Sequence, residues 1–268
     1  MSAEKHEHDG AAPQSDYDTF VNWDARLARE APFFRRVFDE VGAARVIDVG
    51  AGSARHSIMF ATWGLAVDAV DPDDSMLAQA EANIADAAER IAGAGGVVTL
   101  TRGAFGELAG LGVGPADALV CTGNALPHVG NVEGLRTAFA DFAAVLRPGG
   151  AVILHLLNHS RLLAKQPRVI PPVVRNTPDG LRVFLRVLDY PDASDKISFD
   201  FVTMTRDSDG VWQLESRRSD HTALPPDLLQ AELEAAGFDR VELLGGHDGH
   251  ALTDEDESVI VVARRTAG

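Results

Sequence analysis

Two glycines and two carboxylates mark the segment of the chain best suited to chemistry. The stretch VIDVGAGSARHS (46–57) is an apolar run that contains Asp48 and then breaks at Gly50 and Gly52. Such a turn after a strand can cradle a dinucleotide phosphate or the amino-acid end of another adenosine cofactor, or it can be a plain tight turn. A second carboxylate, Asp71, follows Gly50 by 21 residues, where it can accept hydrogen bonds from both ribose hydroxyls.

The residues around the turn favour S-adenosylmethionine over a nicotinamide dinucleotide. A dinucleotide site needs the pattern G-x-G-x-x-G, and Arg55 stands where the third glycine belongs. Asp48 is not part of that pattern, but it can face the positively charged amino group of S-adenosylmethionine, directly or through water. A nicotinamide oxidoreductase is also opposed by the lack of a Tyr-x-x-x-Lys pair.

Alternating strands and helices position these residues. Apolar runs predict strands, and apolar residues at three-to-four spacing predict helices. Before the first strand, residues 17–41 have a helical pattern in which Pro32 is expected to separate two helices. We expect strands at 44–50, 65–71, 97–103, 116–123 and 151–157, and helices at 54–64, 73–95 and 132–146. This alternation predicts an α/β fold with a parallel sheet and helices on both faces.

The rhythm changes after residue 157. Alternating patterns predict antiparallel strands at 181–190, 196–207 and 211–224, with a hairpin turn at Asp209-Gly210. A helix at 226–236 and strands at 240–245 and 258–265 then restore the first pattern. We therefore expect a disordered tail at 1–15, one domain formed by 16–157 and 223–268, and a β-rich insertion at 158–222 that covers the substrate.

Four motifs resemble the class I S-adenosylmethionine-dependent methyltransferases: VIDVGAGSA (46–54), VDAVDPDDSML (67–77), GAFGEL (103–108) and LRPGG (146–150). The resemblance implies a Rossmann-like, seven-stranded methyltransferase sheet and S-adenosylmethionine as cofactor. One departure is Ala104, where many members carry an Asp that meets the adenine amine. The resemblance to these methyltransferases implies the following cofactor-binding residues: Asp48, Gly50, Ala51, Gly52, Asp71, Pro72, Met76, Ala104, Phe105 and Thr122.

Two further stretches, CTGNALPHV (121–129) and YDTFVNWDARLARE (17–30), resemble glycine and sarcosine N-methyltransferases and their small-molecule relatives. This resemblance implies a cover over the methionine end of the cofactor and a substrate-facing, catalytic Asn124. The cover would comprise Tyr17, Trp23, Arg29 and His128. Plainer roles stay open for these residues: a core tryptophan, a surface ion pair, a helix cap and a turn asparagine. His221 and Asn158 are further candidates for substrate binding, although His221 also suits a structural role.

The same resemblance bears on the substrate. In glycine-type enzymes an arginine just past the fifth strand clamps the carboxylate of the amino acid, and aligning Asn158 with the asparagine after it puts Leu157 in its place. Leucine donates no hydrogen bond, so we expect a less charged, more apolar acceptor than free glycine. N-methylation of a small molecule is favoured over O- or C-methylation. A non-catalytic, cofactor-binding regulatory protein is the alternative from another class.

Composition limits the partners. The net charge of −16 makes nucleic acid an unfavourable partner, and no apolar run is long enough for a membrane span. The polar N-terminus resembles neither a signal nor a transit peptide, so a cytoplasmic protein is expected. The single cysteine, Cys121, excludes a Cys-rich metal site, and no paired Asp/Asn arrangement suggests a bound metal. Edge strands in the insertion also allow a homodimer.

Overall fold

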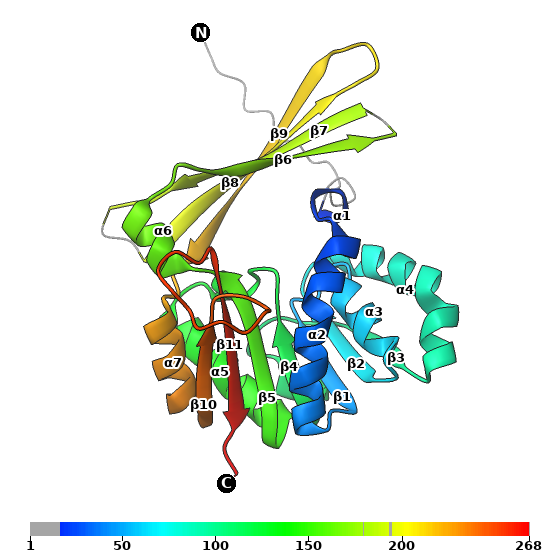
Figure 1. Ribbon diagram of the computed structural model, residues 1–268, viewed down its shortest axis with the longest axis vertical. Coiled ribbons are helices and arrows are strands. Elements are labelled where there is room, and N and C mark those ends of the chain that lie inside the picture. Colours follow the sequence, from blue (N-terminus) through cyan, green and yellow to red (C-terminus); the bar gives the residue numbers. More distant parts are fainter. Residues whose placement is uncertain (1–16, 179, 193–194, 268) are drawn as a thin grey trace.

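The computed structural model describes residues 17–178, 180–192 and 195–267, which form two sheets (Figure 1). The predicted tail at 1–15 lies outside the described residues. The larger sheet has the order β10-β11-β5-β4-β1-β2-β3. Its strands are β1 (Arg45–Val49), β2 (Ala66–Asp71), β3 (Val97–Arg102), β4 (Ala116–Cys121), β5 (Leu146–Leu157), β10 (Phe238–Leu244) and β11 (Ser258–Arg265).

Strands β1 to β5 pair in parallel, while β11 runs antiparallel to both β5 and β10. The inner strands β1, β2 and β4 are buried almost completely, as expected of a parallel sheet that is covered on both faces. The predicted seven-stranded α/β sheet is therefore confirmed, and the glycine turn lies at the carboxyl end of β1.

Helices cover both faces of the larger sheet. One face packs against α5 (Val132–Val145), α7 (Pro226–Ala235) and the short helix η1 (Leu108–Leu111). The other face packs against α2 (Trp23–Val41), α3 (Arg55–Ala61) and α4 (Asp74–Ala94). Two further short helices, α1 (Tyr17–Phe20) and η2 (Leu126–Val129), lie near the carboxyl ends of the strands (Figure 1). Within the described ranges, no helix is long and apolar enough to cross a bilayer.

The second sheet is antiparallel and has the order β6-β7-β8-β9. It lies beyond the end of β5, and α6 (His159–Lys165) connects the two (Figure 1). The expected Asp209-Gly210 turn joins the last two strands, with Gly210 at φ 81°. The strands are β6 (Val169–Thr177), β7 (Gly180–Asp189), β8 (Lys196–Arg206) and β9 (Trp212–Thr222).

The expected helix break at Pro32 is wrong, because α2 continues through that residue. The break lies earlier, between α1 and α2, where the Asn22 side chain caps the second helix by accepting the N–H of Ala25 at 3.3 Å. Beyond Pro32 the helix buries a continuous apolar face against the sheet, which offsets the hydrogen bond that proline cannot donate. That face consists of Phe33, Phe34, Val37 and Phe38.

Strand β6 and helix α6 were not expected from the sequence. Pro171 and Pro172 lie inside β6 and oppose a strand, but β6 is an edge strand whose pairing with β7 shifts register between Ile170 and Val173. The prolines occupy that irregularity, where no ladder hydrogen bond is needed from them.

Candidate functional site

The glycine turn is tied to strand β2. The N–H groups of Gly50 and Ala51 both donate to the carbonyl of Val70, at 2.8 and 3.1 Å. Gly50 has φ 70°, and a Cβ there would lie 2.6 Å from the Cβ of Ala125. Gly52 has φ 55°, also in the left-handed region. Glycine is therefore needed at position 50 both for its backbone conformation and for the close approach of the loop after β4.

The two predicted carboxylates lie on either side of this turn. Asp71 accepts the N–H of Gly52 at 2.7 Å and, through its other oxygen, that of Asp73 at 3.0 Å. Each of its oxygens keeps a lone pair for a ribose hydroxyl. Asp48 is buried and accepts the Ser57 hydroxyl at 2.5 Å through Oδ2.

The surroundings of Asp48 Oδ1 show whether these residues fit S-adenosylmethionine. This atom is buried and has no hydrogen-bond partner in the described part of the chain. Burial raises the pKa of Asp48, which an adjacent ammonium group would oppose. A buried acceptor without a donor beside a glycine turn fits the amino group of the cofactor.

The other predicted cofactor residues lie around the same edge of the sheet. Pro72 and Met76 follow Asp71 at the start of α4, and Ala104 and Phe105 follow β3. The Phe105 ring approaches the turn, since its Cζ lies 3.9 Å from the Cβ position of Gly50. This arrangement places Phe105 beside the turn.

Thr122 directly follows β4, which lies on the other side of β1 from β2. Its buried hydroxyl lies 3.3 Å from His56 Nδ1, at the second residue of α3. The structure therefore brings the residues implied by the methyltransferase motifs to one edge of the larger sheet.

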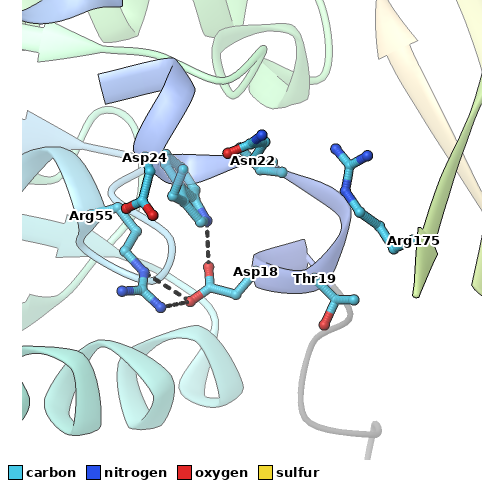
Figure 2. Close-up of a pocket in the computed structure, with 8 residues that line it drawn as sticks. Asp18, Thr19, Asn22, Asp24, Arg55 and Arg175 are labelled. Atoms are coloured by element: carbon cyan, nitrogen blue, oxygen red, sulfur yellow. Dashed lines mark hydrogen bonds and ion pairs between the residues drawn. The ribbon is translucent and has the colours of Figure 1, made fainter. Parts of the chain in front are cut away.

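A segment that we call the lid, residues 17–24, is fastened to the glycine turn by Asp18 (Figure 2). The Asp18 carboxylate accepts from Trp23 Nε1 at 2.9 Å and from the Ser53 hydroxyl at 2.5 Å. Arg55 donates to it at 2.6 and 3.0 Å, and Asn83 at 3.1 Å. Arg55, which stands where a dinucleotide site has its third glycine, therefore forms an ion pair with Asp18 that holds the lid to the turn.

The lid also contacts the second sheet. Arg175 of β6 donates to the carbonyl of Phe20 at 3.1 Å, and the Phe20 ring lies 5.6 Å from that of Phe184 in β7. On its inner side, the Tyr17 hydroxyl lies 3.1 Å from the Cβ position of Gly123, directly before Asn124. Tyr17 and Trp23 pack edge to face at 5.8 Å. The lid therefore joins the glycine turn, the loop after β4 and the second sheet.

The structure does not bring Arg29 to the glycine turn. Its side chain is 69% exposed and lies 3.5 Å from Glu30, which matches the surface ion pair that the sequence left open. Arg26, one helical turn earlier, is the inward-facing cation. It lies over the Trp23 ring at 5.2 Å and donates to Glu30 at 3.0 Å, and its Nη2 is buried with no hydrogen-bond partner among the described residues.

Asn124 and His221 meet between the two sheets. Asn124 Oδ1 accepts the N–H of Leu157 at 3.0 Å, so its Nδ2 is the group that donates to His221 Nδ1 at 3.1 Å. His221 Nδ1 is therefore unprotonated, and in a neutral ring Nε2 carries the proton. Burial lowers the pKa of His221 to about 3, so the ring is neutral at pH 7.

His221 is packed on both sides. Its ring stacks on Phe199 at 4.3 Å and meets the exposed His128 ring at 4.5 Å. Its Nε2 is buried and has no hydrogen-bond partner within the residues that the structure describes. Asn124 itself has φ 66°, a conformation that asparagine tolerates better than most residues. The site thus holds one unsatisfied N–H donor next to Asn124.

The Asn158 side chain serves the scaffold. Its Oδ1 accepts the N–H of Arg161 at 3.2 Å and caps α6, and its Nδ2 donates to the carbonyls of Thr253 and Asp256. These bonds leave it no free polar group for a substrate.

Sequence reasoning missed Asp18, Arg26 and Arg175. Asp18 had a signal, because Arg55 in a position that favours glycine implies a nearby carboxylate. Arg26 lies four residues before Glu30, the spacing of a helical ion pair.

Comparisons with known proteins agree with this geometry. A family model described as a methyltransferase domain matches residues 46–150. A glycine/sarcosine N-methyltransferase from Parasynechococcus marenigrum (strain WH8102) is 33% identical over 148 residues, covering 55% of this chain and 50% of that protein. The chain spans about half the length of the curated glycine/sarcosine N-methyltransferases that it matches.

Solved structures share the fold. The sugar N-methyltransferase KedS8 from Streptoalloteichus sp ATCC 53650 has a TM-score of 0.72 at 20% identity, covering 99% of both chains. SAM-bound CalS10, an amino pentose methyltransferase from Micromonospora echinaspora, has a TM-score of 0.70 at 22% identity, covering 97% of this chain and 100% of that one. Since the sheet order, the motifs and the family model agree, the chain contains a methyltransferase domain and has the fold of the S-adenosylmethionine-dependent methyltransferases.

Proposed function

We propose that this protein methylates the nitrogen of a small, uncharged amine that carries an oxygen close to that nitrogen. The observation that carries the proposal is the unsatisfied Nε2–H of His221 beside Asn124. A buried donor without an acceptor costs free energy, and an oxygen of the bound amine would remove that cost. Alcohol, ether and carbonyl oxygens all qualify, as in an amino alcohol or an amino sugar.

S-adenosylmethionine, when bound, supplies a methyl group on a positively charged sulfur, which leaves as a neutral thioether on in-line attack. The chain's own residues would hold the two reactants. We assign the ribose hydroxyls to Asp71, the cofactor's amino group to Asp48 and its carboxylate to Arg26, whose Nη2 is buried without a partner. Arg26 takes the role that the sequence resemblance gave to Arg29, because Arg29 faces solvent.

The lid supports the transfer by excluding water. Tyr17 and Trp23 lie over the turn and the loop after β4, and a dry site keeps the amine nitrogen unsolvated. Asn124 and His221 would orient the acceptor so that the nitrogen lone pair faces the methyl group. No strong general base is required, because the proton can leave the nitrogen after transfer.

The wall of the acceptor site is apolar. Leu157 packs against a cluster of Leu162, Leu188, Ile197 and Phe199 below His221. A carboxylate placed against these side chains would lose its hydration, and none of them supplies a cation, so free glycine is disfavoured. We assign residues 158–222 the role of substrate cover, as the sequence suggested.

We also propose that the protein acts in the cytoplasm.

The names of the relatives favour nitrogen as the acceptor atom. The curated relative acts on glycine and sarcosine, and the two solved structures are a sugar N-methyltransferase and an amino pentose methyltransferase. O- or C-methylation would need an activated oxygen or carbon, and the neutral His221 is a weak base for either. The alternative, a regulatory protein that binds the cofactor without turnover, would retain the same glycine turn, so a turnover assay is needed to separate the two.

A panel of paired acceptors tests the proposal. [Methyl-13C]S-adenosylmethionine is supplied with amino sugars and amino alcohols, with the same amines lacking the oxygen, with the corresponding diols and with glycine. We expect 13C label on nitrogen, and the largest kcat/KM for the oxygen-bearing amines. In His221→Ala the oxygen-bearing amine loses about 10- to 100-fold in kcat/KM, as expected for one buried hydrogen bond, while the amine without oxygen loses little.

Three outcomes would contradict the proposal: label on oxygen or carbon, glycine as good as the best amine, or no turnover with any acceptor. A carboxylate-bearing acceptor whose methylation depends on Arg161 would also contradict it, because it would show a cationic clamp just past β5.

A further inference from the structure

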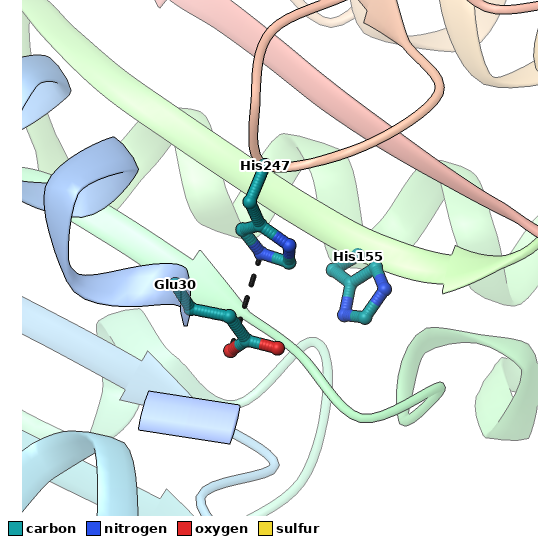
Figure 3. Close-up of side chains that lie close together, drawn as sticks. All are labelled: Glu30, His155 and His247. Atoms are coloured by element: carbon teal, nitrogen blue, oxygen red, sulfur yellow. Dashed lines mark ion pairs between the residues drawn. The ribbon is translucent and has the colours of Figure 1, made fainter. Parts of the chain in front are cut away.

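Three side chains from distant parts of the chain lie close together (Figure 3). Glu30 comes from α2, His155 from β5, and His247 from the loop between β10 and β11. One potential ligand atom from each lies within 4.8 Å of those of the other two. Two imidazoles and one carboxylate form the donor set of many zinc sites with an open coordination position.

Both histidines have nitrogen atoms without a partner. His155 Nδ1 and His247 Nε2 are buried, and neither has a hydrogen-bond partner in the part of the chain that the structure describes. The His247 side chain is only 7% exposed, and its Nε2 lies 4.0 Å from Glu30 Oε2. Buried nitrogens without partners are rare in proteins, because each costs the free energy of its lost hydration.

The separation suits two ligands of one ion better than a hydrogen bond. Ligand atoms about 2.1 Å from a tetrahedral ion lie roughly 3.4 Å from one another. Movements of a few tenths of an ångström to about 1 Å in side-chain position would bring these three atoms to that spacing.

Neighbouring groups hold the carboxylate in place. His56 Nε2 lies 2.7 Å from Glu30 Oε2, and Arg26 Nε donates to Oε1 at 3.0 Å. Such outer contacts fix the orientation of a metal-binding carboxylate. The positive charges of Arg26 and Arg29 would repel a metal cation bound at this site.

The cluster is also open to entry. A cavity reaches His155 and His247, and its wall includes the acidic residues Asp248 and Glu257. Arg29 and His250 line the same cavity, and Asp248 is paired with His250, so Glu257 is the acidic group that offsets part of the positive charge near an incoming cation. Water or a small ligand could complete the coordination from this side.

We propose that Glu30, His155 and His247 form a site for a divalent first-row transition metal of the zinc class. The bound ion would clamp the helix that carries the lid to β5 and to the loop before β11. The site adjoins the methyl-transfer groups, because Glu30 accepts from Arg26 and the carbonyl of His155 accepts the N–H of Asn124 at 3.2 Å. The absence of thiolate ligands favours Zn2+, Co2+ or Ni2+ over Cu+.

Metal binding to the purified full chain tests the proposal. After treatment with a chelator, Co2+ is titrated and its visible absorption is recorded, and Zn2+ is then added to displace it. We expect one Co2+ per chain with the intense spectrum of four or five ligands, a rise in Tm with Zn2+, and loss of both in His247→Ala.

Other histidines need a matched control. His250 is exposed and pairs with Asp248 and Asp256, and His6 and His8 lie outside the described residues. The control variant is His6→Ala/His8→Ala/His250→Ala, which should keep the strong Co2+ site. If His247→Ala does not fold, the test rests on the Co2+ spectrum of the wild type and on its loss in His155→Gln.

Two results would overturn the site. One is a wild-type protein with no Co2+ spectrum beyond that of six water ligands and no Tm shift with Zn2+. The other is binding that is lost in the triple control variant but kept in His247→Ala or His155→Gln, which would place the metal at the surface histidines.

Discussion

The Asp18 carboxylate is the strongest single contact between the lid and the cofactor turn, and its removal should open the lid. In Asp18→Ala the backbone of α1 is free to stay helical, but Trp23, Ser53, Arg55 and Asn83 all lose their common acceptor. The lid keeps its contacts with the second sheet through Phe20. We therefore expect weaker docking rather than unfolding.

The magnitude follows from where each donor can go. Arg55 is 34% exposed and regains water, Trp23 is only partly buried, and Asn83 keeps its bond to the carbonyl of Ser53 at 2.9 Å, so these three recover part of their loss. The buried Ser53 hydroxyl does not. One charge-assisted hydrogen bond and one unsatisfied buried group together cost about 3 kcal/mol, which shifts the ratio of closed to open lid about 100-fold.

Hydrogen exchange with S-adenosylhomocysteine bound measures this shift. Amides in residues 17–30 should exchange up to about 100-fold faster in Asp18→Ala than in the wild type, and the ligand's Kd should rise by a similar factor if the closed lid is needed for tight binding. Asp24→Ala, an exposed carboxylate on the same segment, is the control and should leave both values near those of the wild type. Equal exchange in Asp18→Ala, Asp24→Ala and the wild type would refute the argument.

Two further predictions concern the cofactor and pH. Asp71→Asn should weaken binding of S-adenosylhomocysteine by about 1–3 kcal/mol in calorimetry, with no binding of NAD to either protein; tight NAD binding to the wild type would contradict the assigned cofactor. Acid should destabilise the fold through buried neutral histidines, because burial lowers the pKa of His159 and His247 to about 4 and that of His155 and His221 to about 3, against about 6.5 when unfolded. The unfolded chain then binds more protons below pH 6.5, so this stability is present above that pH and is lost as pH falls. Urea unfolding with a chelator present should show a loss of several kcal/mol from pH 7.5 to 5.5, on the order of 1 kcal/mol for each of these histidines; an unchanged free energy of unfolding would show that these rings titrate normally.

The fold could be predicted because its signals are local. Apolar runs of four to six residues followed by helical spacing predicted each parallel strand within one or two residues, apart from β5, which begins earlier, at Leu146. The turn at Gly50 and Gly52 and the acid at Asp71 lie in motifs whose spacing is set by one strand, one turn and one helix. Edge strand β6 escaped prediction, because an irregular edge pairing tolerates Pro171 and Pro172 where a central strand would not.

The side chains that depend on tertiary contacts could not be predicted. Which arginine of α2 faces inward depends on how the helix rotates against the sheet, and that rotation buries Arg26 and exposes Arg29. The Glu30, His155 and His247 cluster draws on three elements far apart in the chain, so no spacing indicates it. The resemblance to the family predicted that Asn158 binds substrate. In the structure its side chain instead caps α6 and donates to a carbonyl of the β10–β11 loop.

A crystal structure with S-adenosylhomocysteine and a methylatable amine bound tests the central claim most directly. We predict that the ribose hydroxyls lie within hydrogen-bond distance of Asp71, that the amine nitrogen faces the sulfur, and that an oxygen of the amine accepts from His221 Nε2. A ligand whose amine lies away from Asn124 and His221, or whose ribose makes no contact with Asp71, would contradict the proposed mechanism.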